Sequence, residues 1–573
     1  MATTADGALP RIIQGGMGVG VSGWRLARAV SRTGQLGVVS GTALDAVLVR
    51  RLQLGDPDGS VRRALAAFPV PELARAVVDR FHVEGGLRPG ERFRTEPMLR
   101  VERGEPAELL TVLGNFVEVW LAKEGHDGQV GVNYLEKIQL AIAPALFGAI
   151  LAGVDQVLVG AGVPAYVPEL ATRLARGECA TVKITVDGDE NPHPYVFDPT
   201  PYVPTPYVPT PTPAPATSGP DGLAAGPHAP AAPAPTDLPA PATMPTDPAP
   251  APDPSAPAAS VPEPAGATGP GVARCGPGTV AGDPASAGTL PAPANLRRPG
   301  VLAIVSLPVL AAYLARDEAT RPDGFVIETH GAGGHSAPPR GALRLDGDGE
   351  PVYGPRDHPD LAKMAALGIP YWLAGGAAHP ARLAEARAAG AAGVQVGSAF
   401  ALCEQSGLDE GLRSELRDRA RAGTLRVRND PAASPTGFPF KVADLPGTLA
   451  RPEVRAARGR VCDLGYLRTP YRTPKGTIGY RCPAEPEAAY ARKGGDEAAT
   501  EGRLCLCNGL LAAVGLGQTR PGGAVEPPVV TLGQDLDFLT DLSPDGAPYG
   551  AQDVVEWLTN SAPVTAVTAV TAG

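Results

Sequence analysis

Short apolar runs alternate with segments of helical period along much of the chain. The runs are rich in Val, Ile and Leu, and each ends in Gly or a small polar residue. Parallel strands with crossover helices give this pattern, because strands buried on both faces read as continuous apolar runs. The predicted strands are Arg11–Gln14, Leu36–Ser40, Gln129–Asn133, Asp155–Val159, Val301–Ser306, Gly324–Glu328, Ile369–Ala374 and Gly393–Val396.

Eight such units predict an α/β fold of the (β/α)8 TIM-barrel type, since open doubly wound sheets usually have fewer strands. In the first unit, Ser22 is expected to cap a helix that Gly34 ends. Thr42–Gly128 is expected to form a long helical excursion. The segments Thr181–Asp187 and Tyr195–Asp198 are expected to pair as a hairpin.

A Pro/Ala-rich, low-complexity segment interrupts the predicted barrel. It contains too few large apolar residues to offset the entropy of ordering it, so we expect a disordered insertion. Such an insertion costs little, because loop-closure entropy grows only logarithmically with length. We expect an inert spacer, and the alternative is a docking segment for a protein partner that recognises proline.

The composition therefore divides the chain into five parts. The barrel's first part is predicted at 9–198, the insertion at 199–298 and the barrel's second part at 299–425. An irregular C-terminal subdomain at 426–558 is expected to pack on the barrel mouth, and 559–573 to form a disordered tail.

Charge and hydropathy favour a soluble, cytoplasmic enzyme. The formal net charge of -10 argues against general binding of nucleic acid or anionic membrane, which need a basic face. Residues 1–10 lack the features of a signal peptide, and no apolar run reaches the ~18 residues needed to span a bilayer.

Glycine-rich loops follow four of the predicted strands, where a TIM barrel carries its active site. Glycine lets backbone N–H groups approach a ligand, and small-residue loops after the last two strands are the usual phosphate site. We therefore expect a phosphorylated cofactor or substrate. The loop residues are Gln14, Gly15, Gly16 and Met17; Glu328 to His335, with Gly333 and Gly334; Gly375 and Gly376; and Gln395, Val396, Gly397 and Ser398.

His335 is the predicted proton-transfer residue of this site. An imidazole exchanges a proton near neutral pH, and a glycine loop can present it to the barrel mouth. The alternative is a loop histidine that bonds its own turn. His330, in the same loop, is expected to have a structural or pocket-shaping role.

The segment Glu328-Thr329-His330-Gly331-Ala332-Gly333-Gly334-His335, with the two later glycine loops, resembles the nitronate monooxygenase family. The resemblance covers residues 9–180 and 296–405. It implies an FMN-binding flavoprotein, an oxidoreductase that oxidises alkyl nitronates with O2 to carbonyl compounds and nitrite. It also implies that His335 is the catalytic base and that Asn133, Glu328 and Gly333 contact the flavin. Gly375 and Gln395–Ser398 would then hold the phosphate.

Two loops depart from the family pattern, so other readings stay open. Thr329-His330-Gly331 and Gly15-Gly16-Met17 replace more usual residues at positions that would face flavin or substrate. Similar barrels include enoyl-thioester reductases, which pass hydride from NAD(P)H through FMN. A non-catalytic scaffold that uses the Pro-rich segment for partners is the third reading.

The C-terminal region holds a cysteine group and a basic stretch. Seven cysteines without an export signal favour reduced thiols or a metal site over a disulfide framework. Zinc is an alternative, although the spacing lacks Cys-x-x-Cys pairs, and an extended Arg503–Cys507 would put two thiols on one face. The basic stretch Arg458–Arg481 is either internally paired or a surface for an acidic carrier, a phosphopantetheine arm or RNA. The zinc candidates are Cys462, Cys482, Cys505 and Cys507.

Overall fold

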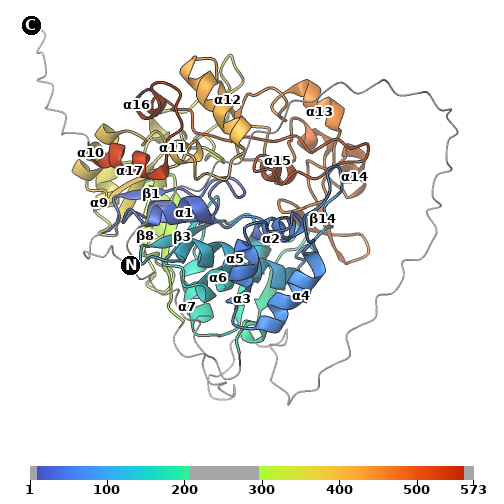
Figure 1. Ribbon diagram of the computed structural model, residues 1–573. Helices are drawn as coiled ribbons and strands as arrows, with labels where there is room; N and C mark the ends of the chain where they lie inside the picture. The colour runs from blue at the N-terminus through green and yellow to red at the C-terminus, as the bar shows by residue number, and fades with distance from the viewer. Residues whose placement is uncertain (1–8, 103, 205–295, 561–573) are drawn as a thin grey trace, which may run out of the picture. The chain divides into compact units, whose positions relative to one another are not determined.

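The eight predicted strands form one parallel sheet that closes into a barrel (Figure 1). The computed structural model describes residues 9–102, 104–204 and 296–560. These residues belong to one compact unit, Met1–Pro215 with Pro277–Gly573. The second unit, Ala216–Gly276, lies outside the described residues, as do most of the predicted insertion and the tail from 561 onward.

The strand order makes the barrel a (β/α)8 barrel. The order is β1-β10-β9-β8-β7-β4-β3-β2, and a parallel bridge between Ile13 and Leu36 joins the two end strands. The backbone N–H of Gln14 donates to the carbonyl of Leu36 at 2.9 Å across this seam. The strands are β1 (Ile12–Gln14), β2 (Gly37–Ser40), β3 (Val130–Leu135), β4 (Gln156–Gly160), β7 (Gly300–Val305), β8 (Gly324–Glu328), β9 (Tyr371–Ala374) and β10 (Gly393–Val396).

Helices connect the strands as predicted, including the helical excursion between β2 and β3. The hairpin also forms, from antiparallel β5 (Ala180–Ile184) and β6 (His193–Phe197), followed by a short helix at Thr200–Tyr202. The helices of the barrel are α1 (Trp24–Ser31), α2 (Leu44–Gln53), α3 (Ser60–Ala66), α4 (Pro71–Phe81), α5 (Glu105–Lys123), α6 (Gln139–Leu151), α7 (Val167–Ala175), α8 (Pro308–Leu314), α9 (Leu361–Ala365), α10 (Pro380–Ala388) and α11 (Ser398–Ala401).

Helices and short strand pairs follow the barrel, and in Figure 1 the helices α12 to α15 lie above α1 and α2, whereas α17 lies beside α1 and α10. Two small antiparallel pairs, β11 with β12 and β13 with β14, give this region its regular hydrogen bonding. Its elements are α12 (Glu410–Arg421), β11 (Val427–Asp430), β12 (Phe440–Ala443), α13 (Pro452–Arg458), β13 (Thr469–Arg472), β14 (Ile478–Arg481), α14 (Glu487–Arg492), α15 (Leu506–Ala512), α16 (Phe538–Leu542) and α17 (Ala551–Asn560).

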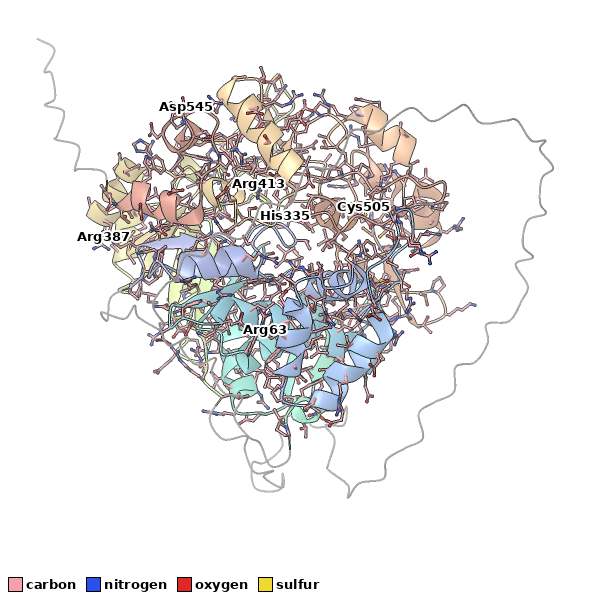
Figure 2. The ribbon with its side chains drawn as sticks, in the orientation of Figure 1. Arg63, His335, Arg387, Arg413, Cys505 and Asp545 are labelled. Carbon is pink, nitrogen blue, oxygen red and sulfur yellow. The ribbon has the colours of Figure 1, made fainter. Side chains whose placement is uncertain are left out.

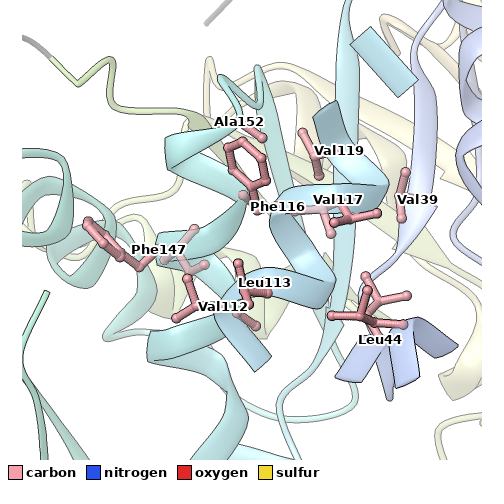
Figure 3. Packing of buried hydrophobic residues seen from close by; sticks show 14 of the residues in the cluster. Val39, Leu44, Val112, Leu113, Phe116, Val117, Val119, Phe147 and Ala152 are labelled. Atoms are coloured by element: carbon pink, nitrogen blue, oxygen red, sulfur yellow. The ribbon is translucent and has the colours of Figure 1, made fainter. Parts of the chain in front are cut away.

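Apolar side chains fill the barrel and the space between its strands and helices. Trp372 is buried in the barrel interior, where it packs in one cluster with Ile13, Leu158 and Val326. Its indole N–H donates to the carbonyl of Pro10 at 2.8 Å. Outside the barrel, α5 and α6 pack through a larger cluster that contains Phe116 (Figure 3). Burying each such side chain stabilises the fold by roughly 1.5–3 kcal/mol, so the strand ends are held by a packed core.

The predicted cap of the first helix is wrong. The residue before α1 is Gly23, and no side chain caps that helix. The buried hydroxyl of Ser22 donates to the carbonyl of Gly15 and accepts from the N–H of Met17, both at 2.9 Å. The backbone of the β1 loop lies close enough to bond this hydroxyl, so Ser22 stabilises the loop that lines the site and does not cap α1.

None of the described helices combines the length and the apolar character needed to cross a membrane.

Candidate active site

A glycine-lined cavity of about 130 Å³ lies at the carboxyl ends of β1, β8, β9 and β10. No Lys or Arg side chain lines it within the described part of the chain. A bound anion would therefore meet backbone N–H groups and the hydroxyls of Ser398 and Thr531, and it would also face the carboxyl groups of Glu328 and Asp535. Its lining residues are Gly15, Gly16, Met17, Gly18, Glu328, Gly331, Ala332, Gly333, Gly334, Ala374, Gly375, Gly376, Ala377, Ala378, Gln395, Val396, Gly397, Ser398, Thr531, Leu532, Gly533 and Asp535.

A second cavity of about 160 Å³ opens over β2, β3 and β4 and holds His335. Its walls are mostly apolar, and several come from the C-terminal region. The lining residues include Val19, Ser40, Thr42, Ala43, Asn133, Tyr134, Leu135, Ile138, Ala161, Ile304, His335, Phe440, Tyr466, Leu467, Leu506, Cys507 and Leu510.

The two cavities lie side by side, because they share part of their walls. The shared residues come from the β1 loop, the β8 loop, the end of β10 and the segment after Val530. They are Gly16, Gly18, Glu328, Gly333, Gly334, Gln395 and Thr531. One end of the site is lined mainly by glycines and other small residues, and the other by larger side chains such as Leu135, Phe440 and Leu506.

Gln395 stands between the two ends with an unused hydrogen-bond acceptor. Its side-chain Oε1 is buried and has no hydrogen-bond partner among the described residues. An unpaired buried amide oxygen costs about 1–3 kcal/mol. A ligand that donates a hydrogen bond at this point would remove that cost.

Glycine is required where the loops approach one another around this site. A Cβ on Gly16 would lie 2.3 Å from the Cβ of Asn133. A Cβ on Gly375, which has φ of +91°, would lie 2.2 Å from the hydroxyl oxygen of Thr329. Gly397 differs, because a Cβ there would meet only the Met17 side chain and otherwise enter open space. The glycines thus both permit the loop packing and leave room for a ligand.

Two alanines in the wider cavity have strained backbones. Ala43, after β2, and Ala161, after β4, have φ of 56° and 59°, a conformation that non-glycine residues rarely adopt. Each costs on the order of 1–3 kcal/mol, and such residues cluster at functional sites. No sequence signal marked these two positions.

His335 is half-buried where the barrel meets the C-terminal region (Figure 2). Its Nε2 is hydrogen-bonded to the hydroxyl of Ser434 at 2.7 Å, and its ring packs edge-on against Phe440 at 4.8 Å. Burial, with the nearby charge of Lys137, lowers the pKa of His335 to about 4. The imidazole is therefore neutral at neutral pH and can act as a base.

Lys441 lies buried behind the β8 loop. Its ammonium donates to the carbonyl of His330 at 2.5 Å and to the hydroxyl of Ser336 at 3.0 Å. Burial lowers the pKa of Lys441 to about 8, opposed by the charges of Glu350 and Glu328. This buried lysine thus fixes the β8 loop through the His330 carbonyl and the Ser336 hydroxyl. The sequence analysis did not identify it, because a single Lys carries no local signal.

Glu328, at the end of β8, lines both cavities. Burial raises its pKa to about 7, and the positive charge of Lys441 opposes that rise. The carboxyl group can therefore hold or release a proton near neutral pH, a property that suits a proton donor as well as a cofactor contact.

His330 has a structural position. Its ring stacks on Tyr353 with 4.2 Å between centroids and an interplanar angle of 10°, and it lines neither cavity. The structural role expected for it agrees with this packing.

Most of the predicted site residues come together. Gly15, Met17, Gly375, Gly376, Val396, Gly397 and Ser398 line the glycine cavity, and Asn133 and His335 line the wider one. Gln14 lines neither. Its side-chain amide donates to Ser22 at 2.9 Å, and its Oε1 accepts from the N–H of Val38 at 3.0 Å. Gln14 therefore joins β1 to β2 and leaves its side chain out of the site.

The four C-terminal cysteines gather near the wider cavity. Cys482 and Cys505 belong to one small apolar cluster, and Cys462 packs against that cluster. Cys507 lines the wall of the wider cavity. No group of three or more His, Cys, Asp or Glu is arranged to hold a metal ion in the part of the chain that the structure describes. Arg503–Cys507 is not extended, because α15 begins at Leu506, so the condition for Cys505 and Cys507 to share one face of a strand is not met.

These four cysteines and Cys403 are free thiols, as expected, whereas Cys179 is disulfide-bonded. The zinc alternative for the C-terminal group therefore has no support in this geometry.

The basic stretch Arg458–Arg481 is largely paired within the chain. Arg458 bonds buried Glu526 at 2.5 Å, Arg472 bonds Asp189 at 2.5 Å and Arg481 bonds Asp187 at 3.2 Å. Carboxylates from distant segments thus neutralise these cations, which favours the internally paired interpretation over a free basic surface.

The fold and site define a TIM barrel with a glycine-lined and an apolar half-site at its mouth. No family model matches the sequence, and a search of curated proteins finds no similar sequence. Solved structures with a similar fold include FabK from Thermotoga maritima (14% identity, TM-score 0.39, covering 96% of this chain and 92% of that one). A nitroalkane oxidase from Streptomyces ansochromogenes is similar at 15% identity and TM-score 0.37, covering 96% and 94%.

A third similar structure is the enoyl reductase domain of MlnA from the macrolactin biosynthesis cluster of Bacillus amyloliquefaciens. It has 11% identity and a TM-score of 0.31, and the match covers 77% of this chain and 65% of that one. At this level of similarity the reaction of this chain does not follow from theirs.

Proposed function

We propose that this chain is an FMN-dependent oxidoreductase that oxidises alkyl nitronates with O2 to carbonyl compounds and nitrite. The observation that carries the proposal is the two-part site, in which a glycine-lined cavity adjoins a second cavity that holds a half-buried, neutral histidine. FMN has a phosphate at one end and a planar ring at the other, which matches a site with these two ends.

The residues present fit this cofactor. Backbone N–H groups of the loops after β9 and β10, with Ser398, would hold the phosphate, as small-residue loops do at this end of a TIM barrel. Gln395 would supply its unused Oε1 to a donor on the cofactor. Gly16, Gly333 and Asn133 would border the ring. When bound, a flavin supplies the electron and O2 chemistry that side chains lack.

His335 would start the reaction of a neutral nitroalkane. Its neutral imidazole takes the α-proton, and the electron pair of the broken C–H bond moves onto the nitro oxygens. Ser434 orients the ring through its hydrogen bond to Nε2. The buried, apolar wall around His335 keeps water from competing for the imidazole.

A second candidate function is the FMN-dependent reduction of an enoyl thioester by NAD(P)H. Glu328 favours it, because a carboxyl group with pKa of about 7 at the shared wall can give a proton to carbon after hydride addition. His335 is less suited to that step, since its lowered pKa keeps it unprotonated at neutral pH.

One experiment separates these candidates. FMN-loaded protein is mixed anaerobically with ethyl nitronate and, in a parallel sample, with NADPH, and the flavin spectrum is followed. Bleaching by the nitronate alone, with nitrite released once O2 is admitted, supports the first proposal. Bleaching by NADPH alone supports the reductase, and protein that takes up no FMN rejects both in favour of a scaffold.

A further inference from the structure

A third cavity, of about 70 Å³, adjoins the apolar half of the active site. The two cavities share Ile138 and Tyr466 as walls. None of the residues assigned to FMN or to proton transfer lines this side cavity. It therefore lies beside the cavity that holds His335 and away from the glycine loops.

The side cavity has a predominantly apolar lining. Met98, Leu99, Leu140, Ile184 and Leu464 contribute to its walls, and they come from four segments that are distant in sequence. Of these, Ile184 and Leu464 are buried, at 2% and 7% exposure, so part of the lining belongs to the core. Such walls suit an alkyl chain, because each CH2 group that it removes from water favours binding.

Tyr466 has a fixed position between the side cavity and the active site. Its hydroxyl donates to the carboxylate of Asp45 at 2.7 Å, and both residues line the side cavity. Asp45 is 6% exposed at the start of α2. The phenol ring therefore forms a rigid wall along which a chain could pass.

Glu96 supplies an unused polar group at the same cavity. Its Oε1 is buried and has no hydrogen-bond partner among the described residues. The neighbouring guanidinium of Arg50 acts on its charge, but it donates to the carbonyl of Leu516 at 2.5 Å and stacks over the ring of Phe93. The Nε of Arg50 is also buried without a hydrogen-bond partner among the described residues, so Arg50 leaves the Glu96 acceptor unbonded.

We propose that the side cavity binds the part of the substrate remote from the reacting carbon, as an unbranched apolar chain whose hydroxyl or amide N–H donates to Glu96. A neutral donor fits this cavity, because its two basic residues, Lys137 and Arg468, balance its two acidic residues, Asp45 and Glu96. The inference rests on the proposed function in taking the substrate's reacting carbon to lie beside His335.

The test compares three substrates of the FMN-loaded protein: nitroethane, nitrohexane and the ω-hydroxy derivative of nitrohexane. For wild type, kcat/KM is expected to rise in that order. Met98→Trp adds bulk at a wall residue that is 37% exposed and so should fold. In this variant, kcat/KM for the hydroxylated chain divided by kcat/KM for nitroethane is expected to fall about tenfold.

Two further variants complete the comparison. Leu54→Trp, at a 42% exposed site away from the cavity, is the matched control and is expected to leave the ratio unchanged. Glu96→Leu is expected to remove the preference for the hydroxylated over the plain chain, about tenfold, while Glu96→Gln keeps an acceptor and most of the preference. The proposal is overturned if kcat/KM of Met98→Trp still rises with chain length as in wild type. It is also overturned if Glu96→Leu still prefers the hydroxylated chain to nitrohexane.

Failure of the side cavity and failure of the nitronate function give different results. If no nitroalkane is turned over, binding of unreactive octanol to the same variants is measured by calorimetry. Binding to wild type and Leu54→Trp that is lost in Met98→Trp supports the side cavity while the proposed reaction is rejected. Equal binding to all three, or none to wild type, overturns the side cavity as well.

Discussion

The imidazole of His335 is hydrogen-bonded through Nε2 to the hydroxyl of Ser434 at 2.7 Å, across 99 positions of sequence. One partner belongs to the glycine loop after β8, and the other to the region that follows the barrel. Since Ser434 is itself bonded to Thr436 at 2.8 Å, the contact orients the imidazole from outside the barrel. The C-terminal region thus takes part in forming the site.

Replacing His335 by Asn tests the proposed base. His335→Asn is expected to lower kcat/KM for neutral nitroethane by about 100-fold or more, since general bases contribute that much. Turnover of preformed ethyl nitronate should change little, because its proton is already removed. Ser434→Ala should give a smaller loss of the same kind. Equal loss on both substrates in His335→Asn would rule out the base role.

The same histidine should make the stability of the fold depend on pH. Its folded pKa is about 4 and its ordinary value 6.5, so the unfolded chain takes up the proton first as the pH falls. Stability is therefore full above the unfolded value and is lost as the pH falls from 6.5 toward 4. Between pH 7 and 5 this contributes a loss of about 2 kcal/mol.

Urea denaturation at matched FMN concentration measures this effect. The fall in unfolding free energy between the two pH values should be smaller in His335→Asn than in wild type. His358→Asn, at a histidine that lines neither half of the site, serves as the control. A pH dependence identical in all three proteins would contradict the lowered pKa of His335.

A large side chain placed in the glycine cavity should weaken the binding of FMN. Gly397 has a negative φ of -110°, and a side chain there enters open space beside Met17. Gly397→Leu is therefore expected to weaken FMN binding about tenfold or more without backbone strain, measured by fluorescence titration. Gly347→Leu, with no atom within 4 Å of its Cβ position, is the matched control. Unchanged FMN affinity in Gly397→Leu would place the cofactor elsewhere.

Lys441 should stabilise both the fold and the charge of Glu328. Lys441→Met leaves the His330 carbonyl and the Ser336 hydroxyl without their donor, which is expected to cost about 1–3 kcal/mol of unfolding free energy. Loss of the positive charge should also raise the pKa of Glu328 further, which infrared titration of the carboxyl band can follow. Lys363→Met, at a side chain that is 75% exposed, should show neither effect.

The barrel could be predicted from the sequence because its signals are local. Two strands, Gly324–Glu328 and Gly393–Val396, have the predicted bounds, since a β-branched run ending at a glycine loop is decided within a few residues. The glycine loops could be located for the same reason. Parallel strands place their carboxyl ends at one mouth, so the loops had to meet there.

Contacts between segments far apart in the chain were decided only by the tertiary structure. Ser22 bonds the β1 loop instead of capping α1, because the distance to competing partners, not the residue type, selects its bond. Lys441, Ser434 and Tyr466 reach the site from a region without clear periodicity, and no local pattern encodes which strand end they cover. Local sequence thus determined the strands and loops of the mouth, while long-range packing determined the groups that surround His335.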